Sequence, residues 1–476
     1  MNAVKIGNTR ELFWDDYLID TARTNAYLKQ HPPVAREIVR SFDQPWEGDS
    51  GNYWTVVKLD DGYRMYYIIR NMFTEDGKGL EKNKMRINCM ESKDGIHWTA
   101  PELDIRPFGE HQKTNTLLDG QDAPTFDNFY VFIDENPNCP PEEKFKATSR
   151  CDRNGYLWCW ISADGYHWKK GWQMTNRGVF DSLNVAFWSP EHNQYFCFIR
   201  GFHNMYGPNE WDGIRDIRVI TSPDFRNWSD SRMLDFGSNA EDYELYTNCV
   251  HRCPRAPHMM IGFPTRYIER KEWTENYDSL PSPQDRKDRM AISPRLGLAV
   301  TDVILMTSRD GYHWLRGDEA WVEPGIEYAY NWKYGDCYPS VGLIQTPSDL
   351  PGAPDEYSMF MGEGAWGKKP MYLRRYTIRM DGFRSYRADN APCTLVTKPL
   401  LYEGGKLHLN FSTSAKGSIY VTLRSRDTVI RSCELFGNTL DRVVAFDGDL
   451  NQFLGKEITL EFIMSDADLY SMQFAD

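Results

Sequence analysis

Five segments of the chain place an acidic side chain shortly before a run of β-forming residues, and four of them add an asparagine. Carboxylates and amides at the start of a strand often serve only to form turns. If the five segments met in one pocket, however, burial and like charge would raise some carboxyl pKa values and leave other groups ionised. An acid and a base, or an acid and a nucleophile, could then coexist near neutral pH. The acidic residues are Asp49, Asp127, Asp181, Glu244 and Asp336, and the asparagines are Asn52, Asn128, Asn184 and Asn248.

A short phrase that recurs four times indicates which elements position these side chains. Each copy has a serine, an aspartate two residues later and a tryptophan four residues after the aspartate. The copies begin at Ser92, Ser162, Ser222 and Ser308, and a degraded fifth copy begins at Asp381. An unequal repeat of this size predicts one supersecondary unit that is used about five times, with loops inserted between the copies.

The residue types in the phrase predict a hairpin corner. Asp-Gly supplies a tight turn, the serine and aspartate can bond nearby backbone, and the tryptophan would wedge between adjacent sheets. The runs before the copies, such as 85–90 and 157–161, are rich in β-formers and predict the third strand of a four-stranded unit. The sequence therefore predicts an all-β fold with a five-bladed β-propeller, in which the acidic segments meet at one end of the axis.

The repeat and the patterning also predict the domains. We expect the propeller to cover residues 1–393, with 1–40 as an N-terminal strand segment that packs on it or helps close its ring. Residues 269–295 are highly charged and contain prolines, which predicts an insertion that forms a surface flap or an oligomer contact. From residue 394 to 476, period-two alternation between glycine and aspartate turns predicts a C-terminal β-sandwich that braces the propeller.

Composition restricts the classes of partner. The net charge of −13 and the lack of any segment dense in lysine and arginine argue against nucleic acid and against an anionic membrane. No run of residues approaches the ~18 apolar residues of a membrane helix. The N-terminal residues lack the apolar core of a secretion signal, so we expect a cytoplasmic protein, with a mature secreted form left open. A homo-oligomer also stays open.

Neither a metal nor a cofactor is indicated. The ten cysteines show no C-x-x-C spacing. Cys249, His251 and Cys253 would share one face of a strand but lack a fourth zinc ligand. The chain has no glycine-rich phosphate loop. We therefore expect no metal site and no required cofactor, with a cation in the channel near Asp127 or Asp336 left open.

The predicted architecture with its acidic pocket resembles the five-bladed propeller glycosidases of glycoside hydrolase families 32, 43 and 68, with family 32 closest in layout. Those enzymes carry an aspartate on the first inner strand, a second aspartate and then a glutamate, and the order and spacing of Asp49, Asp181 and Glu244 match. The local motifs depart from family 32. Residues 46–52 read Trp-Glu-Gly-Asp-Ser-Gly-Asn in place of Trp-Met-Asn-Asp-Pro-Asn-Gly, Phe-Asp-Ser replaces Arg-Asp-Pro, and Glu-Leu replaces Glu-Cys. The resemblance thus implies a distant relation.

The resemblance implies a glycoside hydrolase or transglycosidase that cleaves a furanoside such as a fructo- or arabino-oligosaccharide with two carboxyl groups. Asp49 would be the nucleophile or base, and Glu244 the general acid. Asp181 would bind sugar hydroxyls and keep Glu244 protonated. The carbohydrate substrate is expected to contact Asn52, Trp54, Asp127, Asn128, Asn184, Arg200, Tyr246, Asn248, Arg266 and Asp336.

Two alternatives remain. A glycoside phosphorylase on the same scaffold would use inorganic phosphate in place of water and would need arginine, lysine or histidine side chains at the pocket, for which Arg374, Arg375 and His203 are candidates. A non-catalytic carbohydrate-binding propeller is the other alternative. It would be favoured if Glu244 pointed away from the channel.

Overall fold

Strands dominate the computed structural model, which describes residues 3–72, 74, 85–209, 212–329, 331–366 and 370–476. In these ranges, the α-helices are α1 (Glu275–Ser279), α2 (Pro283–Ile292) and α3 (Pro294–Leu298), all within one short stretch of the chain. Short 3-10 turns lie at Thr21–Arg23, Pro141–Glu143 and Leu450–Phe453. The prediction of an all-β fold is confirmed.

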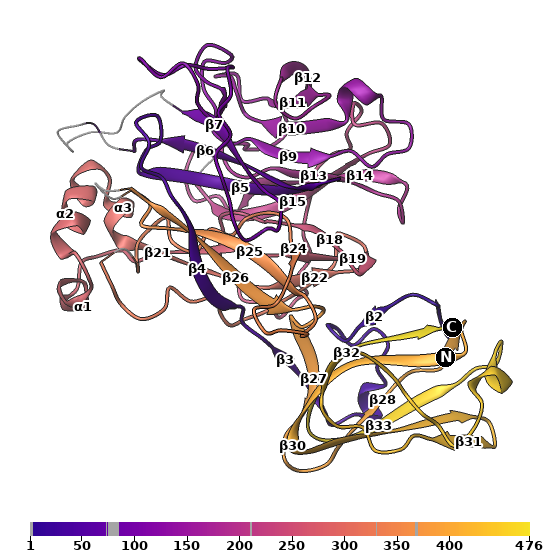
Figure 1. Ribbon diagram of the computed structural model, residues 1–476. Helices are drawn as coiled ribbons and strands as arrows, with labels where there is room; N and C mark the ends of the chain where they lie inside the picture. Colours follow the sequence, from indigo (N-terminus) through magenta and orange to yellow (C-terminus); the bar gives the residue numbers. More distant parts are fainter. Residues whose placement is uncertain (1–2, 73, 75–84, 210–211, 330, 367–369) are drawn as a thin grey trace.

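Within the described part of the chain, strand pairing forms five four-stranded sheets that make up the larger body in Figure 1. Their neighbouring strands pair antiparallel. The sheets are β5 (Ser50–Leu59), β6 (Gly62–Arg70), β7 (Arg86–Ser92) and β8 (Thr116–Leu118); β9 (Tyr130–Ile133), β10 (Phe145–Ser149), β11 (Leu157–Ser162) and β12 (Lys169–Thr175); β13 (Val185–Ser189), β14 (Gln194–His203), β15 (Ile214–Ser222) and β16 (Arg232–Met233); β18 (His251–Cys253), β19 (Ala256–Gly262), β22 (Met306–Ser308) and β23 (Trp314–Arg316); and β24 (Ile344–Thr346), β25 (Glu356–Glu363), β26 (Tyr372–Arg379) and β4 (Val34–Ser41).

The fourth of these sheets continues into a three-stranded sheet of β17 (Glu244–Leu245), β20 (Thr265–Glu269) and β21 (Ala299–Val303). The break falls at Pro264, which lies between β19 and β20 and has no N–H to donate to a neighbouring strand. The carbonyl of Pro264 still accepts a bond from Ile304, at 3.0 Å, so the two sheets stay joined.

The first strands of the four-stranded sheets contact one another in chain order. β5 contacts β9, β9 contacts β13, and β13 contacts β18. The Cys249 thiol, just before β18, donates to the carbonyl of Pro339, which precedes β24, at 3.2 Å. A parallel bridge between Thr55 and Val341 then leads back to β5. The five sheets therefore surround a common axis, and β4 from the N-terminal segment supplies the outer strand of the last sheet by pairing with β26.

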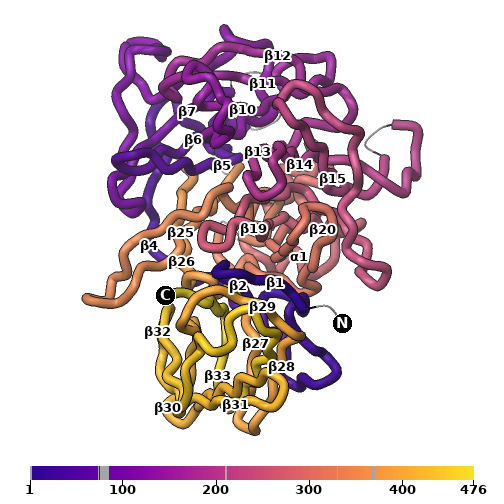
Figure 2. Tube along the Cα trace, turned by 90° about the vertical axis from the view of Figure 1, so that its right-hand side faces the viewer, coloured from indigo at the N-terminus to yellow at the C-terminus, as the bar shows by residue number. Residues whose placement is uncertain are grey.

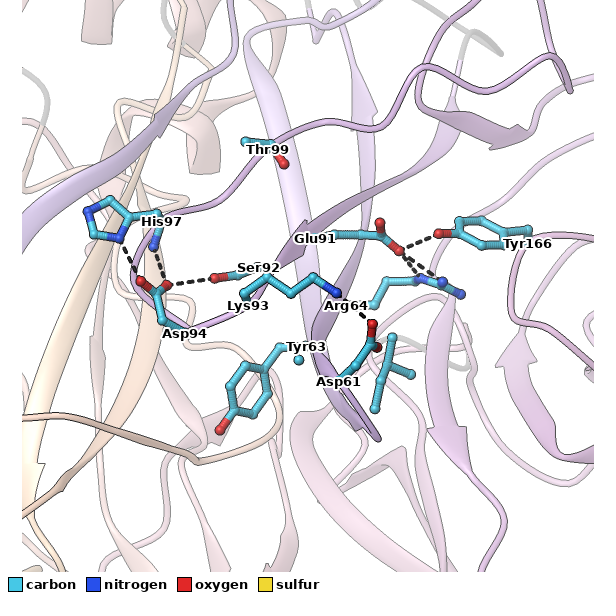
Figure 3. A pocket seen from close by; sticks show the side chains of 12 residues that line it. Asp61, Tyr63, Arg64, Glu91, Ser92, Lys93, Asp94, His97, Thr99 and Tyr166 are labelled. Carbon is cyan, nitrogen blue, oxygen red and sulfur yellow. Dashed lines mark hydrogen bonds and ion pairs between the residues drawn. The ribbon is translucent and has the colours of Figure 1, made fainter.

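The repeated phrase forms a corner after the third strand of a sheet, as Figure 3 shows for its first copy. The Asp94 carboxylate accepts bonds from the backbone N–H groups of Ile96 and His97, both at 2.8 Å. The Ser92 hydroxyl accepts one from Gly95, also at 2.8 Å. Gly95 has a φ of +76°, which explains the Asp-Gly pair. The same bonds recur at Asp164 and Asp310.

Three of the four tryptophans of the phrase pack against a neighbouring sheet. Trp98 contacts Phe360 of β25 edge-on, with ring centres 5.4 Å apart. Trp168 contacts Tyr66 of β6 at 6.0 Å. Trp314 contacts Phe198 of β14 at 5.8 Å. The predicted role of these residues as wedges between sheets is confirmed.

The C-terminal strands form a separate lobe, seen below the sheets in Figures 1 and 2. Its sheet has the order β3 (Tyr27–Gln30), β27 (Arg384–Ala388), β33 (Thr459–Ala475), β30 (Lys406–Ser425) and β31 (Thr428–Arg431). β2 (Glu11–Leu12) and β28 (Cys393–Val396) also pair with β33, and β32 (Asn438–Val443) pairs with β30. β1 (Val4–Gly7) pairs with β29 (Leu400–Tyr402). The segment from residue 4 to residue 30 therefore contributes three strands to this lobe, before β4 joins the ring of sheets.

The charged insertion packs against the ring of sheets through α2. Arg286 and Arg289 of this helix are 1% and 2% exposed. Arg286 donates to the carbonyl of Trp332, and Arg289 donates to that of Trp366 at 2.5 Å. These bonds tie the insertion to the segments before β24 and after β25, next to the start of β5.

Candidate functional site

A cavity of about 190 Å³ lies where the segments that precede the inner strands meet. β5, the end of β6, the loops before β9, β13 and β24, and α3 all contribute side chains to it. Its lining residues are Ser50, Asn52, Tyr53, Ile68, Arg70, Met72, Met85, Asp127, Asp181, Tyr246, Arg295, Tyr334, Tyr338 and Trp366.

Asp49 lies directly behind the lining of the cavity. Its carboxylate accepts a bond from the backbone N–H of Met72 at 2.8 Å, and its carbonyl accepts one from Trp366 at 2.7 Å. Both of these residues line the cavity. Burial raises the pKa of Asp49 to about 6, although the Met72 N–H and the charge of Arg289 act in the opposite direction.

Asp127 and Asp181 line the cavity itself, and each is paired with an arginine. Asp127 lies 3.2 Å from Arg150. Asp181 forms an ion pair with Arg200, which is 5% exposed. Burial raises the pKa of Asp127, against the effects of Arg150, Arg70 and Arg200. The cavity is therefore lined by two carboxyl groups, each of which is paired with an arginine.

Glu244 and Asp336 lie outside this set of lining residues. Glu244, on β17, forms an ion pair with Arg215 of β15. The Arg215 guanidinium lies 5.5 Å from the ring centre of Tyr246, which lines the cavity. Asp336 is 7% exposed and accepts a bond from the N–H of Lys333 at 2.9 Å. Burial raises its pKa to about 7, against the nearby positive charges of Arg289, Lys333 and Arg286.

Three of the four asparagines hold backbone together. Asn128 and Asn184 each donate to the carbonyls of residues 180 and 182, at distances from 2.6 to 3.0 Å. Asn248 donates to the carbonyls of residues 183 and 198, at 3.0 and 3.2 Å. These bonds join the starts of β9, β13 and β18. Their side chains are fully or almost fully buried.

Asn52 lines the cavity, whereas Trp54 lies in the core between the rings of Phe42 and Tyr67, 5.2 and 5.0 Å away. Strict alternation along β5 would place both on one face, but the pairing of β5 with β6 is irregular between Asn52 and Thr55. Tyr53 has a φ of +56° at this bulge and turns its side chain to the cavity. Such strained non-glycine backbone costs about 1–3 kcal/mol and often marks functional sites.

The remaining expected contacts divide between the cavity and the outside. Tyr246 lines the cavity, and its hydroxyl accepts a bond from the Tyr334 hydroxyl at 2.7 Å. Arg266 pairs with Asp302, at 2.9 Å from its Nε, and also donates to the carbonyl of Asp318.

Several lining residues were not anticipated from the sequence. Arg70 ends β6 after two isoleucines, much as Arg200 follows Phe-Ile within β14, so the pattern that selected Arg200 could also have found Arg70. Arg295, in the charged insertion, carries no comparable signal. The other unanticipated residues are Ser50, Tyr53, Ile68, Met72, Met85, Tyr334, Tyr338 and Trp366.

A second cavity of about 610 Å³ adjoins the first, because Arg70 and Met85 line both. Trp46 and Phe108 offer aromatic side chains to it, and Gln121 offers an amide. A further cavity of about 450 Å³, shown in Figure 3, is lined by the corner residues around Asp94 and shares no lining residue with the first.

Among the described residues, no three histidine, cysteine, aspartate or glutamate side chains are grouped so that they could hold a metal ion. All ten cysteines are free. No helix in the described ranges has the length and apolar character to cross a membrane.

The structure is similar to solved structures that include a fructofuranosidase, a glycoside hydrolase and a deacetylase. A variant fructofuranosidase from Schwanniomyces occidentalis, complexed with fructosylnystose, is 11% identical over 96% of this chain and 98% of its own, with a TM-score of 0.39. A thermostable family-43 glycoside hydrolase is 13% identical over 73% of this chain and 93% of its own, with a TM-score of 0.41. An N-acetylgalactosamine deacetylase from F. plautii, in complex with blood group B trisaccharide, is 13% identical over 74% and 94%, with a TM-score of 0.43.

No family model matches the sequence, and no curated protein matches it by sequence. With TM-scores below 0.5, the structural likenesses assign neither a family nor an activity to this chain.

Proposed function

We propose that the protein is a glycoside hydrolase or transglycosidase, and that its substrate is a furanoside such as a fructo- or arabino-oligosaccharide. In this proposal the ring of sheets is a five-bladed β-propeller within residues 1–393, and residues 394–476 form a C-terminal β-sandwich that β1, β2, β3 and β27 join. The observation that carries the proposal is the cavity at the starts of the inner strands, where the carboxyl groups of Asp49, Asp127 and Asp181 gather and where burial raises the pKa values of Asp49 and Asp127.

Glycoside cleavage needs one carboxyl group that protonates the departing oxygen and one carboxylate that attacks the anomeric carbon or activates water. We assign the second role to Asp49. A pKa of about 6 leaves this group mostly ionised at neutral pH, close to the optimum for a base. Its place behind Met72 and Trp366 requires these lining residues to move slightly when substrate binds.

The general acid has two candidates. Glu244 is the one that the family resemblance implies, and in this role its ion pair with Arg215 would have to open when substrate binds. Asp127 already lines the cavity, and its raised pKa suits a proton donor. The Asp181 carboxylate would accept hydrogen bonds from sugar hydroxyls, and the Asn52 amide would both accept and donate such bonds. The adjoining cavity beyond Arg70 offers space for the rest of an oligosaccharide.

The test is a kinetic comparison of Asp49→Asn, Glu244→Gln and Asp127→Asn on a natural oligosaccharide and on an activated aryl glycoside. Asp49→Asn should lose activity on both substrates, because attack at the anomeric carbon is needed whichever group departs. The variant of the true general acid should lose about 10²–10⁴-fold on the oligosaccharide and much less on the aryl glycoside, whose leaving group needs little protonation.

Asp302→Asn provides the matched control, because this carboxylate pairs with Arg266 outside the cavity. It should behave like the wild type. Equal, modest losses for all three test variants on both substrates would contradict the catalytic assignment and favour a carbohydrate-binding protein without catalysis.

A phosphorylase is a second candidate. The residues first considered for it are engaged elsewhere: Arg374 pairs with Glu363, Arg375 with Glu37, and His203 with Asp216 and Asp242. Two other arginines, Arg70 and Arg295, do line the cavity and support this candidate.

A further inference from the structure

Two arginines, Arg70 and Arg295, line the cavity. Among the described residues, neither Arg70 nor Arg295 forms an ion pair. Arg295 donates a bond to the Tyr334 hydroxyl at 3.0 Å and lies 4.9 Å above the ring of that residue. The charge of Arg70 lowers the pKa values of Asp49 and Asp127, but neither carboxylate is bound to it. By contrast, Arg150, Arg200 and Arg215 are each paired with an acidic residue.

Two further N–H groups beside the cavity lack acceptors. The Nε atoms of Arg200 and Arg215 are buried and have no hydrogen-bond partner within the described part of the chain. Both guanidinium groups lie near the ring centre of Tyr246, at 5.6 and 5.5 Å. Arginine stays charged in proteins, so these groups cannot relieve the mismatch by losing a proton.

Tyr246 reports the resulting positive potential. Burial alone would raise the pKa of its hydroxyl, yet Arg295, Arg200 and Arg215, together with the bond from Tyr334, lower it to about 8. A neutral sugar would leave the guanidinium groups of Arg70 and Arg295 without a direct anionic contact in a partly dehydrated site, although Asp127 and Asp181 also line the cavity. An oxyanion would neutralise both arginines and accept their donors.

We propose that the cavity binds an oxyanion, a carboxylate or phosphate group, between Arg70 and Arg295. This inference rests on the proposed function and specifies its substrate class. The planar fork of an arginine matches both anions. The group can come from two sources: a carboxylate that belongs to an acidic sugar, or free inorganic phosphate that takes the place of water.

If inorganic phosphate is the bound anion, the products of the reaction change, but the general acid has the same role. The glycosidic C–O bond breaks, a phosphate oxygen bonds to the anomeric carbon, and the proton of the general acid goes to the departing oxygen. The products are a glycosyl phosphate, with the phosphate on the anomeric carbon, and a shortened glycoside. With an acidic sugar, water attacks instead, and a free uronate or a uronate-containing fragment is released.

Isothermal titration of the full chain with inorganic phosphate, glucuronate, galacturonate and neutral glucose tests the proposal. We expect saturable binding of phosphate or of a uronate and none of glucose. Arg70→Gln and Arg295→Gln should each weaken this binding about 10-fold or more, as expected for the loss of a charged hydrogen bond. Arg70→Lys and Arg295→Lys, which keep the charge, should retain part of it.

Arg23→Gln is the matched control. This substitution removes the same charge, but from an exposed arginine on the Thr21–Arg23 turn, which lies outside the cavity. It should bind as the wild type does. Failure of all three anions to bind would overturn the proposal. So would wild-type affinity in both glutamine variants when circular dichroism shows that they are folded.

The products separate the two sources and also separate this inference from the proposed function. A sugar phosphorylated on its anomeric carbon and formed only in the presence of phosphate identifies phosphate, and phosphate-independent cleavage of a uronate-containing glycoside identifies the acidic sugar. Cleavage of neutral furanosides without anion binding would overturn the inference alone. Anion binding without turnover of any glycoside, with or without phosphate, would support the inference and contradict the proposed function.

Discussion

The aspartates of the repeated corners and those of the axial cavity occupy the two ends of the same structural unit, and their surroundings differ. At the corners, Asp94 accepts two backbone N–H groups and a contact from His97. These bonds lower its pKa, although partial burial opposes them. In the cavity region, burial instead raises the pKa values of Asp49, Asp127 and Asp336. One end of each unit is built for stability, and the other buries carboxyl groups and raises their pKa values, as is common at catalytic or binding sites.

The substitution Asp49→Asn should have the largest effect, because it should lower activity while it raises stability. We expect kcat/KM to fall by about 10²–10⁴-fold, because the attacking carboxylate is lost. The same variant should be more stable than the wild type at pH 7, by about 1–2 kcal/mol, because a buried charge is removed. Chemical denaturation at pH 7 measures the stability. A loss of both activity and stability would mean that Asp49 serves the fold.

The pH dependence of this stability has a definite sign. The folded pKa of Asp49 is raised from 3.8 to about 6, so the folded state binds the proton more tightly than the unfolded state. Its ionisation therefore reduces stability as the pH rises through the interval from 3.8 to 6. The stabilising effect of Asp49→Asn should vanish when the pH is lowered below this interval.

Trp314→Ala should produce the largest loss of stability at a corner. The side chain is 4% exposed and packs edge-on against Phe198 of the neighbouring sheet. Replacing a buried tryptophan by alanine typically costs about 3–5 kcal/mol. Tyr206→Ala, at a side chain that is 77% exposed, is the control and should change stability by less than about 0.5 kcal/mol. A small effect at Trp314 would contradict the assignment of the corners to stability.

The sequence predicted the corners better than the cavity, for a physical reason. Corner bonds such as those of Asp94 join residues that are at most three positions apart, so a local motif specifies them. The positions of Asp127 and Asp181 followed from the repeat, because each precedes an inner strand. Arg295 and Tyr334 reach the cavity through an insertion and a loop that have no repeat partner. Local spacing could not have placed these two residues.

Trp54 illustrates a different difficulty. It was expected to contact substrate because it lies on the first inner strand near Asp49. The bulge between Asn52 and Thr55 turns Tyr53 to the cavity and Trp54 into the core. A one-residue irregularity exchanges the two faces of a strand, and period-two patterning does not reveal it.

The pH profile of the reaction tests whether Asp49 acts as a base or nucleophile, or as the general acid. A base or nucleophile must be ionised, so kcat/KM should decrease about 10-fold per pH unit below the pKa of about 6. The residual activity of Asp49→Asn should lack this acidic limb. A decline above pH 6 that disappears in Asp49→Asn would instead identify Asp49 as the general acid. A profile in which the variant keeps the acidic limb would assign this limb to another group.

The smallest expected effect comes from Asp94→Asn at a corner. The amide oxygen can still accept a backbone bond, but the charge that strengthens the contacts with Ile96 and His97 is lost. Because the folded pKa of Asp94 is lowered, its carboxylate stabilises the fold above the unfolded pKa and ceases to do so as the pH falls. We expect stability to fall by about 1 kcal/mol at pH 7, a value reduced for the exposure of the side chain, and kcat/KM to stay unchanged.

Asp427→Asn, at an exposed aspartate of the C-terminal lobe, is the control and should change neither quantity. The same chemical substitution would thus stabilise the protein at Asp49 and destabilise it at Asp94, and equal signs at the two positions would contradict the contrast between cavity and corner.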